Sequence, residues 1–166
     1  MKQIITFGLF LIAGAMIAPR SSAQELPREI LGVNLKMTKE DAQKRLREMG
    51  VFVRDEAGWQ EVWKIHDGSF SHLIIGSGKD GKLHYVTAIA REDKEAKRVA
   101  YDTIGNLRKA RQAGDPAIKN FSYQWDLPAK EGYPHMLVIA AGRDPKFLTT
   151  YSLKNLDNAS AREEKE

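Results

Sequence analysis

The most regular pattern of hydrophobic and polar positions lies near residue 40. Ala42, Leu46 and Met49 recur at helical spacing, with charged residues between them. Thr38 precedes them and can cap the backbone N–H groups of a first turn, and Gly50 follows as a natural stop. The pattern therefore predicts an amphipathic helix that begins after Thr38 and ends before Gly50.

Strand-like runs follow this helix, and in them apolar and polar residues alternate. Ala-Gly and Asp-Gly pairs separate the first runs, and Asp-Gly between apolar stretches is typical of hairpin turns. A second helix is predicted over residues 103–113, ending at Gly114, before the remaining strands. The strand-like runs cover residues 51–55, 59–65, 72–77, 82–91, 120–127, 135–141 and 147–154.

An offset of 64 residues brings two blocks of the sequence into register without a gap. DGSFSHLIIGSGKDGKL at 67–83 falls on EGYPHMLVIAAGRDPKF at 131–147, with six identical residues. The same offset superposes the ends of the two predicted helices at Gly50 and Gly114. An internal duplication explains the match, although two hairpins with similar turn chemistry would also share the turn pattern G-[KR]-D-x-K.

These patterns predict an α+β fold of two helix-plus-antiparallel-meander repeats, with the helices on one face of the sheet. The first repeat is expected at residues 24–98 and the second at 99–156. A polar, charged tail at 157–166 is expected to be disordered.

The opening of the first repeat carries a family resemblance. ILGVNLKMTKEDAQKRL, at residues 30–46, resembles the small exported domains of the SmpA/OmlA type, the outer-membrane assembly lipoproteins. The duplication resembles the beta-lactamase inhibitory proteins, in which two helix-plus-sheet units form a concave sheet that clasps another protein. The resemblance implies this architecture over residues 30–155. The chain lacks the lipidated cysteine of the first group and the cysteines of the second.

The first 23 residues have the tripartite pattern of a secretory signal peptide. Met1-Lys2 gives a positive start, Ile4 to Ala18 is apolar, and Ser21-Ser22-Ala23 supplies small residues before Gln24. The apolar run of about fifteen residues is shorter than the roughly twenty of a spanning helix. We expect cleavage after Ala23, a secreted or periplasmic protein, and no transmembrane segment after cleavage.

Composition excludes several classes of protein. The chain of 166 residues is 42% hydrophobic and 29% charged, which is typical of a globular domain. Since it has no cysteine, disulfide frameworks, thiol nucleophiles and thiolate metal sites are excluded. The formal net charge of +4 includes Lys2 and Arg20 of the signal. The mature chain is therefore only weakly basic, and nucleic acid is not an expected partner.

No motif in the sequence assigns a reaction. Gly76 to Gly81 satisfies G-x-G-x-x-G, but β-rich residues follow it where a phosphate-binding loop needs a helix, so a hairpin turn is favoured. Histidines occur at positions 66, 72, 84 and 135 without metal-ligand spacing, so no metal or other cofactor is expected. The alternative that stays open is a secreted hydrolase-type enzyme that uses a histidine with Asp67 or Asp80.

The aromatic residues give the candidate binding surface. With Asp80-Gly81 as the turn, an aliphatic face carries Leu73, Ile75, Val86 and Ala88, and by the repeat also Leu137 and Ile139. We expect helices to cover that face and the opposite, aromatic face to meet a partner, although strand aromatics also commonly form core. The candidate partner-binding residues are Tyr85, Tyr123, Trp125, Tyr151, His72 and Trp63. The sequence thus favours an exported, non-enzymatic protein-binding or envelope-associated module.

Overall fold

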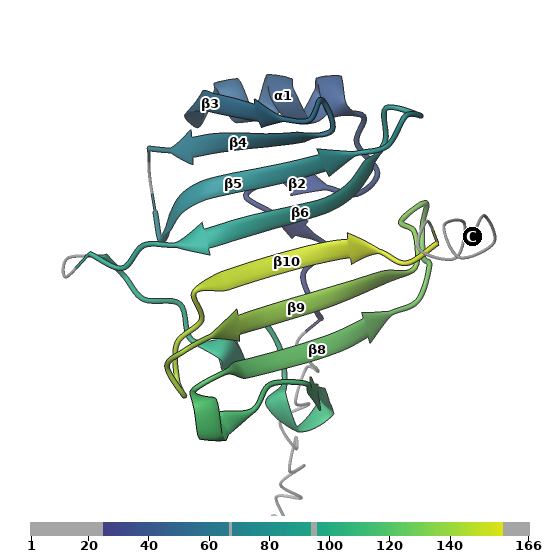
Figure 1. The fold of residues 1–166 in the computed structure, drawn as a ribbon. Coiled ribbons are helices and arrows are strands. Elements are labelled where there is room, and N and C mark those ends of the chain that lie inside the picture. Colours follow the sequence, from purple (N-terminus) through teal and green to yellow (C-terminus); the bar gives the residue numbers. More distant parts are fainter. Residues whose placement is uncertain (1–24, 67, 94–95, 158–166) are drawn as a thin grey trace, which may run out of the picture.

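The computed structural model describes residues 25–66, 68–93 and 96–157. Their main element is one antiparallel sheet of eight strands in the order β3-β4-β5-β6-β10-β9-β8-β7 (Figure 1). Two runs of consecutive strands, β3 to β6 and β7 to β10, meet where β6 pairs with β10. The strands are β3 Gly50–Glu56, β4 Gln60–Ile65, β5 Phe70–Ser77, β6 Leu83–Ala90, β7 Arg111–Gln112, β8 Phe121–Leu127, β9 Met136–Gly142 and β10 Thr150–Asn155.

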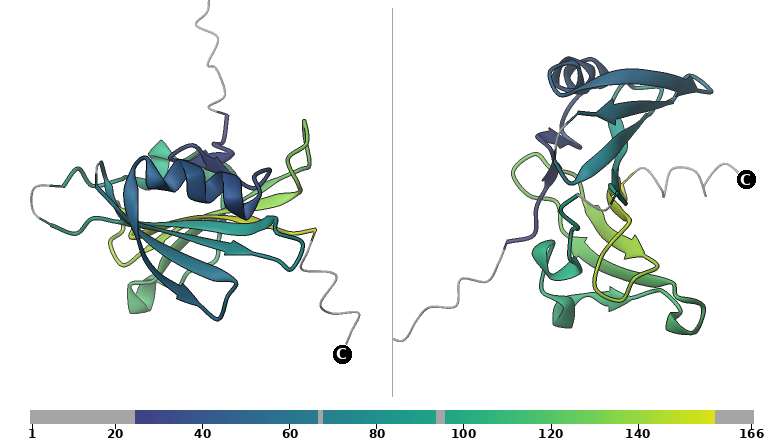
Figure 2. Two further views of the ribbon diagram at one scale, coloured as in Figure 1. Left: turned by 90° about the horizontal axis from the view of Figure 1, so that it is seen from above. Right: turned by 90° about the vertical axis from the view of Figure 1, so that its left-hand side faces the viewer.

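The predicted first helix is confirmed as α1, Lys39–Arg47. The Thr38 hydroxyl accepts a hydrogen bond from the Asp41 backbone N–H at 3.2 Å, and Ala42 and Leu46 are buried. A small hairpin of β1, Glu29–Ile30, and β2, Val33–Asn34, precedes the helix. Both lie on the same side of the large sheet (Figure 2), and we call this side the covered face.

The predicted second helix is wrong. Residues 103–113 contain the end of one 3₁₀ turn, η1 Tyr101–Thr103, a second 3₁₀ turn, η2 Leu107–Lys109, and β7, with irregular residues between them. A third 3₁₀ turn, η3 Pro116–Ile118, follows. Gly105, which has a low helix propensity, lies within the expected helix, and a β-carbon there would lie 2.3 Å from Leu26 Cδ2. The Asn106 side chain accepts from the Arg108 N–H at 2.9 Å and starts a new turn inside the expected helix.

The expected α+β fold of two helix-plus-meander repeats is therefore wrong as well. The structure is mostly β, and α1 is the single α-helix of the described residues. The second meander, β7 to β10, has 3₁₀ turns where the first has α1. The two meanders form one continuous sheet, since β6 pairs with β10.

The two blocks that match at an offset of 64 residues have similar turns, but the matched residues of their strands lie on opposite faces of the sheet. Asp80 accepts from the Lys82 N–H at 3.1 Å, and Asp144 accepts from the Lys146 N–H at 2.8 Å, so both turns have the same side-chain-to-backbone bond. Leu73, however, lies on the covered face, whereas its counterpart Leu137 lies on the opposite one. One residue of strand register exchanges the faces. Common turn chemistry thus accounts for the part of the match that the structure retains.

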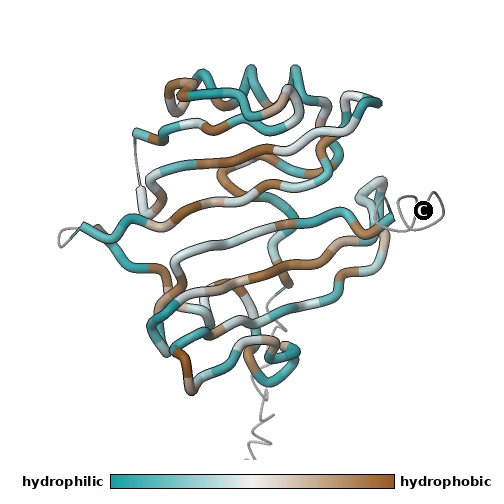
Figure 3. Tube along the Cα trace, in the orientation of Figure 1, coloured by the Kyte–Doolittle hydropathy of each residue, from teal (hydrophilic) through white to brown (hydrophobic). Residues whose placement is uncertain are grey.

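The uncovered face of the sheet is concave (Figure 2). Apolar residues gather in the central strands, and hydrophilic ones on α1 and the connections (Figure 3). No helix of the described residues is long and apolar enough to cross a membrane. The expected signal at 1–23 lies outside the described residues, as does the expected tail apart from Asp157.

Candidate functional site

Three of the predicted partner-binding rings are core. Trp63, Trp125 and Tyr151 are only 3%, 3% and 4% exposed, and all lie on the covered face. The sequence predicts that Leu73, Ile75, Leu137 and Ile139 all lie on the covered face. In the first meander Leu73 and Ile75 do lie there, whereas in the second Leu137 and Ile139 lie on the open face. In this structure the three rings are therefore part of the core and are not presented on an open surface.

The other predicted residues are half-buried and do not converge. Tyr123 lies on the covered face with its ring 4.9 Å from that of Tyr101. His72 and Tyr85 lie on the open face. The Tyr85 ring fills the space above Gly76, and its hydroxyl donates to the Gln60 side chain. Tyr85 is thus held by its own sheet.

The histidines do not form a hydrolytic site within the described residues. His135 Nε2 lies 2.6 Å from Asp126 Oδ1, and both side chains are exposed to solvent. His84 is 3.7 Å from Asp80, and His72 is 3.1 Å from the hydroxyl of Ser71. None of these contacts joins a histidine to both a carboxylate and a hydroxyl. Asp67 lies outside the described residues, which hold no cluster suited to a metal ion.

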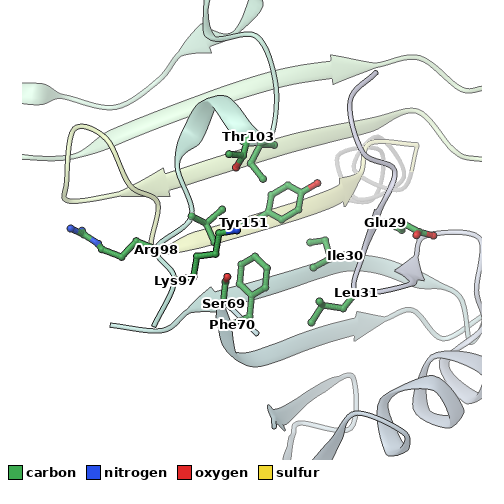
Figure 4. Close-up of a pocket in the computed structure, with 11 residues that line it drawn as sticks. Glu29, Ile30, Leu31, Ser69, Phe70, Lys97, Arg98, Thr103 and Tyr151 are labelled. Atoms are coloured by element: carbon green, nitrogen blue, oxygen red, sulfur yellow. The ribbon is translucent and has the colours of Figure 1, made fainter. Parts of the chain in front are cut away.

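A cavity of about 340 Å³ lies on the covered face, between the sheet, the β1 hairpin and the connection that follows β6 (Figure 4). We call it the Tyr151 cavity. Its polar residues are Glu29, Ser69, Lys97, Arg98 and Thr103. Its apolar wall consists of Ile30, Leu31, Phe70, Val99, Ile104 and the ring of Tyr151.

Backbone bonds fix the outer wall of the Tyr151 cavity. The Val99 carbonyl accepts from the Leu148 N–H at 3.0 Å, and the Tyr101 N–H donates to the Lys146 carbonyl at 3.3 Å. The connection is thereby tied to the loop between β9 and β10. On the inner wall, Tyr151 stands between Ala88 of β6 and Ala140 of β9. These small neighbours leave room beside the ring.

The Tyr151 hydroxyl is the distinctive group of the cavity. It is buried and has no hydrogen-bond partner among the described residues. Burial raises the pKa of the Tyr151 phenol far above its usual value, because the phenolate would be poorly solvated. The group is therefore a neutral O–H donor at any physiological pH. A buried polar group without a partner costs a fold about 1–3 kcal/mol.

Charged side chains surround the mouth of the cavity. Arg98 already has partners, since its guanidinium lies 3.0 Å from Asp144 and 4.1 Å from the centre of the Phe147 ring. Lys97 is exposed and has no ion-pair partner among the residues that the structure describes. Its side chain extends toward Tyr151, whereas Glu29 lies on the other side of the cavity (Figure 4). The cavity thus combines an apolar interior, a buried donor and an available cation.

A second, larger hollow of about 610 Å³ has a more polar lining, in which Lys36 pairs with neighbouring residues. Lys36 Nζ donates to the Glu131 carbonyl at 3.1 Å and lies 4.7 Å from the centre of the Tyr133 ring. Among the described residues, the other buried side-chain atom without a partner is Nη1 of Arg28, whose guanidinium lies 5.4 Å from the centre of the Tyr133 ring but is not part of the lining.

A scan against protein-family models, a search of curated proteins and a search of solved structures found no match to this chain. The resemblance to SmpA/OmlA domains and beta-lactamase inhibitory proteins stays a prediction.

Proposed function

We propose that this chain is an exported, non-enzymatic binding module that holds a small, largely apolar molecule in the Tyr151 cavity. The observation that carries this proposal is Tyr151, which lines the cavity and whose hydroxyl is buried without a hydrogen-bond partner among the described residues. Folded proteins pair nearly all buried polar groups. The hydroxyl oxygen has almost no accessible surface, so a ligand oxygen reaches it only when the side chains around it shift, and it would then remove the energetic cost of the unpaired donor.

The shape and lining of the cavity support a small ligand. A volume of about 340 Å³ lies at the lower end of the range of about 300–1,000 Å³ that is typical of small-molecule sites. Apolar walls with a few polar groups are also typical of such sites. The ligand would be a single short chain or one ring with an oxygen that accepts from Tyr151.

A protein partner, expected from the sequence, is a second candidate. The observation that favours it is Trp59, which is 49% exposed and packs edge-on against Tyr85 at 6.3 Å. An exposed tryptophan beside a tyrosine on a concave sheet resembles the aromatic centre of many protein interfaces. Capture experiments with Trp59→Ala as the matched variant would test this candidate, which predicts that the substitution abolishes capture of the partner.

The proposed cavity ligand is tested by titrating the purified protein with 2-octanone, a neutral chain that carries one carbonyl acceptor, and following amide NMR shifts. We expect saturable shifts at Ile30, Val99 and Tyr151. Val99→Trp fills the cavity and should abolish them. Ile118→Trp adds the same side chain at a position that is 72% exposed, and should leave them unchanged. Absence of saturable shifts in the unaltered protein would overturn the proposal.

The proposed export is tested separately. The intact mass of the protein recovered from outside the cytoplasm should correspond to a chain that starts at Gln24. A full-length chain that retains Met1 and fractionates with membranes would contradict cleavage.

A further inference from the structure

The charges at the mouth of the Tyr151 cavity are not equivalent. Arg98 is held by Asp144 and by the ring of Phe147. The side chain of Glu29 lies across the cavity and is directed away from its centre, whereas Lys97 reaches along the cavity toward Tyr151 (Figure 4). The charge most available to a bound molecule is therefore the ammonium group of Lys97.

The two polar groups of the site also differ in depth. Lys97 is exposed, and the Tyr151 hydroxyl is fully buried. The phenolic oxygen lies at the end of the ring that is farther from Lys97 (Figure 4). A ligand that satisfies both groups must have a charged end near solvent and an uncharged acceptor inside, with an apolar segment between them.

We infer that the ligand of the Tyr151 cavity is an anionic amphiphile, a small monocarboxylate whose carboxylate pairs with Lys97 and whose uncharged oxygen accepts from Tyr151. This inference rests on the proposed function. The carboxylate stays at the hydrated mouth, so it does not incur the large cost of burying a charge. The volume of about 340 Å³ suits one short chain rather than a two-chain lipid.

The experiment compares two probes of eight carbons each, 2-octanone and 7-oxooctanoate, in which a carboxylate replaces the terminal methyl group. We expect 7-oxooctanoate to bind about threefold to fivefold more tightly at low salt, as a partly solvated ion pair allows. Lys97→Met should remove this difference, which is read as the ratio of the two affinities within that variant because Lys97 also lines the cavity. Lys109→Met, an exposed position outside the cavity lining, should preserve it.

The possible results distinguish the inferred anionic ligand from the proposed binding of a small molecule in the Tyr151 cavity. If 2-octanone binds and 7-oxooctanoate binds no more tightly, the anionic head is wrong and the apolar cavity site stands. If the difference persists in Lys97→Met, the assignment to Lys97 is overturned. If neither probe binds, both the inference and the proposed function fail. Added salt should reduce the advantage of 7-oxooctanoate and leave 2-octanone unaffected.

Discussion

Two buried polar side chains on the covered face of the sheet have opposite surroundings. Glu61 lies under α1 and is 4% exposed; it accepts from Lys39 Nζ at 3.0 Å, Gln43 Nε2 at 2.6 Å and Trp63 Nε1 at 3.0 Å. Tyr151 is equally buried beneath the connection after β6, and its hydroxyl has no partner among the described residues. The difference separates a polar network that is complete within the fold from a buried donor that is left without an acceptor.

The covering segments explain this difference. A helix satisfies its own backbone bonds and presents side chains at regular intervals, so α1 brings Lys39 and Gln43 to Glu61 while Ala42 and Leu46 fill the core. The connection over Tyr151 uses short 3₁₀ turns and extended residues, and its backbone bonds go to the β9–β10 loop. It closes the core incompletely, and the Tyr151 cavity remains.

The largest expected loss of stability comes from truncating a buried ring of the second meander. It tests whether this meander contributes to the hydrophobic core although the Tyr151 cavity lies beside it. Trp125 packs near Gly105, and its indole N–H donates to the Asn106 carbonyl at 3.1 Å. Trp125→Ala should lower the free energy of unfolding by about 4 kcal/mol in urea denaturation. Trp59→Ala, the same change at an exposed position, should cost less than about 1 kcal/mol. Similar losses in both variants would contradict the burial that separates them.

A smaller loss is expected from breaking the network under α1. Glu61→Ala leaves Lys39, Gln43 and Trp63 without their shared acceptor, and should lower the free energy of unfolding by about 3 kcal/mol. Glu48→Ala removes an exposed carboxylate that pairs with Arg45 at 2.7 Å, and should cost about 0–0.5 kcal/mol. If Glu61→Ala were equally mild, the network would not contribute to the fold as described.

The smallest changes in the free energy of unfolding are expected from removing the hydroxyl of a buried tyrosine. Tyr101→Phe should lower this free energy, and Tyr151→Phe should not. Tyr101 donates to the Asp144 carbonyl at 3.1 Å, so Tyr101→Phe should lower the free energy of unfolding by about 1 kcal/mol. Tyr151→Phe removes an unpaired hydroxyl and should leave that free energy unchanged or raise it by about 1 kcal/mol. Parallel denaturation curves measure both. A clear loss in Tyr151→Phe would show that the hydroxyl has a partner within the fold.

Local signals explain what could be predicted from the sequence. The Thr38 cap and the apolar spacing of Ala42 and Leu46 specify α1 within a dozen residues. The Asp80 turn fixes the pairing of β5 with β6, so the shared face of Leu73 and Val86 followed from alternation. From His72 to Gly76 the turn alone sets the pairing with β6, and the pairing shifts by one residue at Ser77, next to the turn.

The errors arose where distant segments decide the structure. The face of Tyr151 depends on how β10 pairs with β6, about 60 residues earlier in the chain, and a one-residue change in that register inverts it. Gly105 packs closely against Leu26 and Trp125, which are distant in the sequence, and no local pattern reveals these contacts. The Tyr151 cavity was missed because its outer wall is part of the segment expected to form a linker and a helix.

The most direct test of the account is the affinity of Tyr151→Phe for 2-octanone, measured by the same NMR titration as for the unaltered protein. The substitution keeps the ring and the cavity and removes only the donor. The account predicts binding that is about fivefold weaker, the loss of one hydrogen bond, in a protein that is no less stable. Unchanged affinity would contradict the claim that the buried hydroxyl of Tyr151 is kept for a ligand.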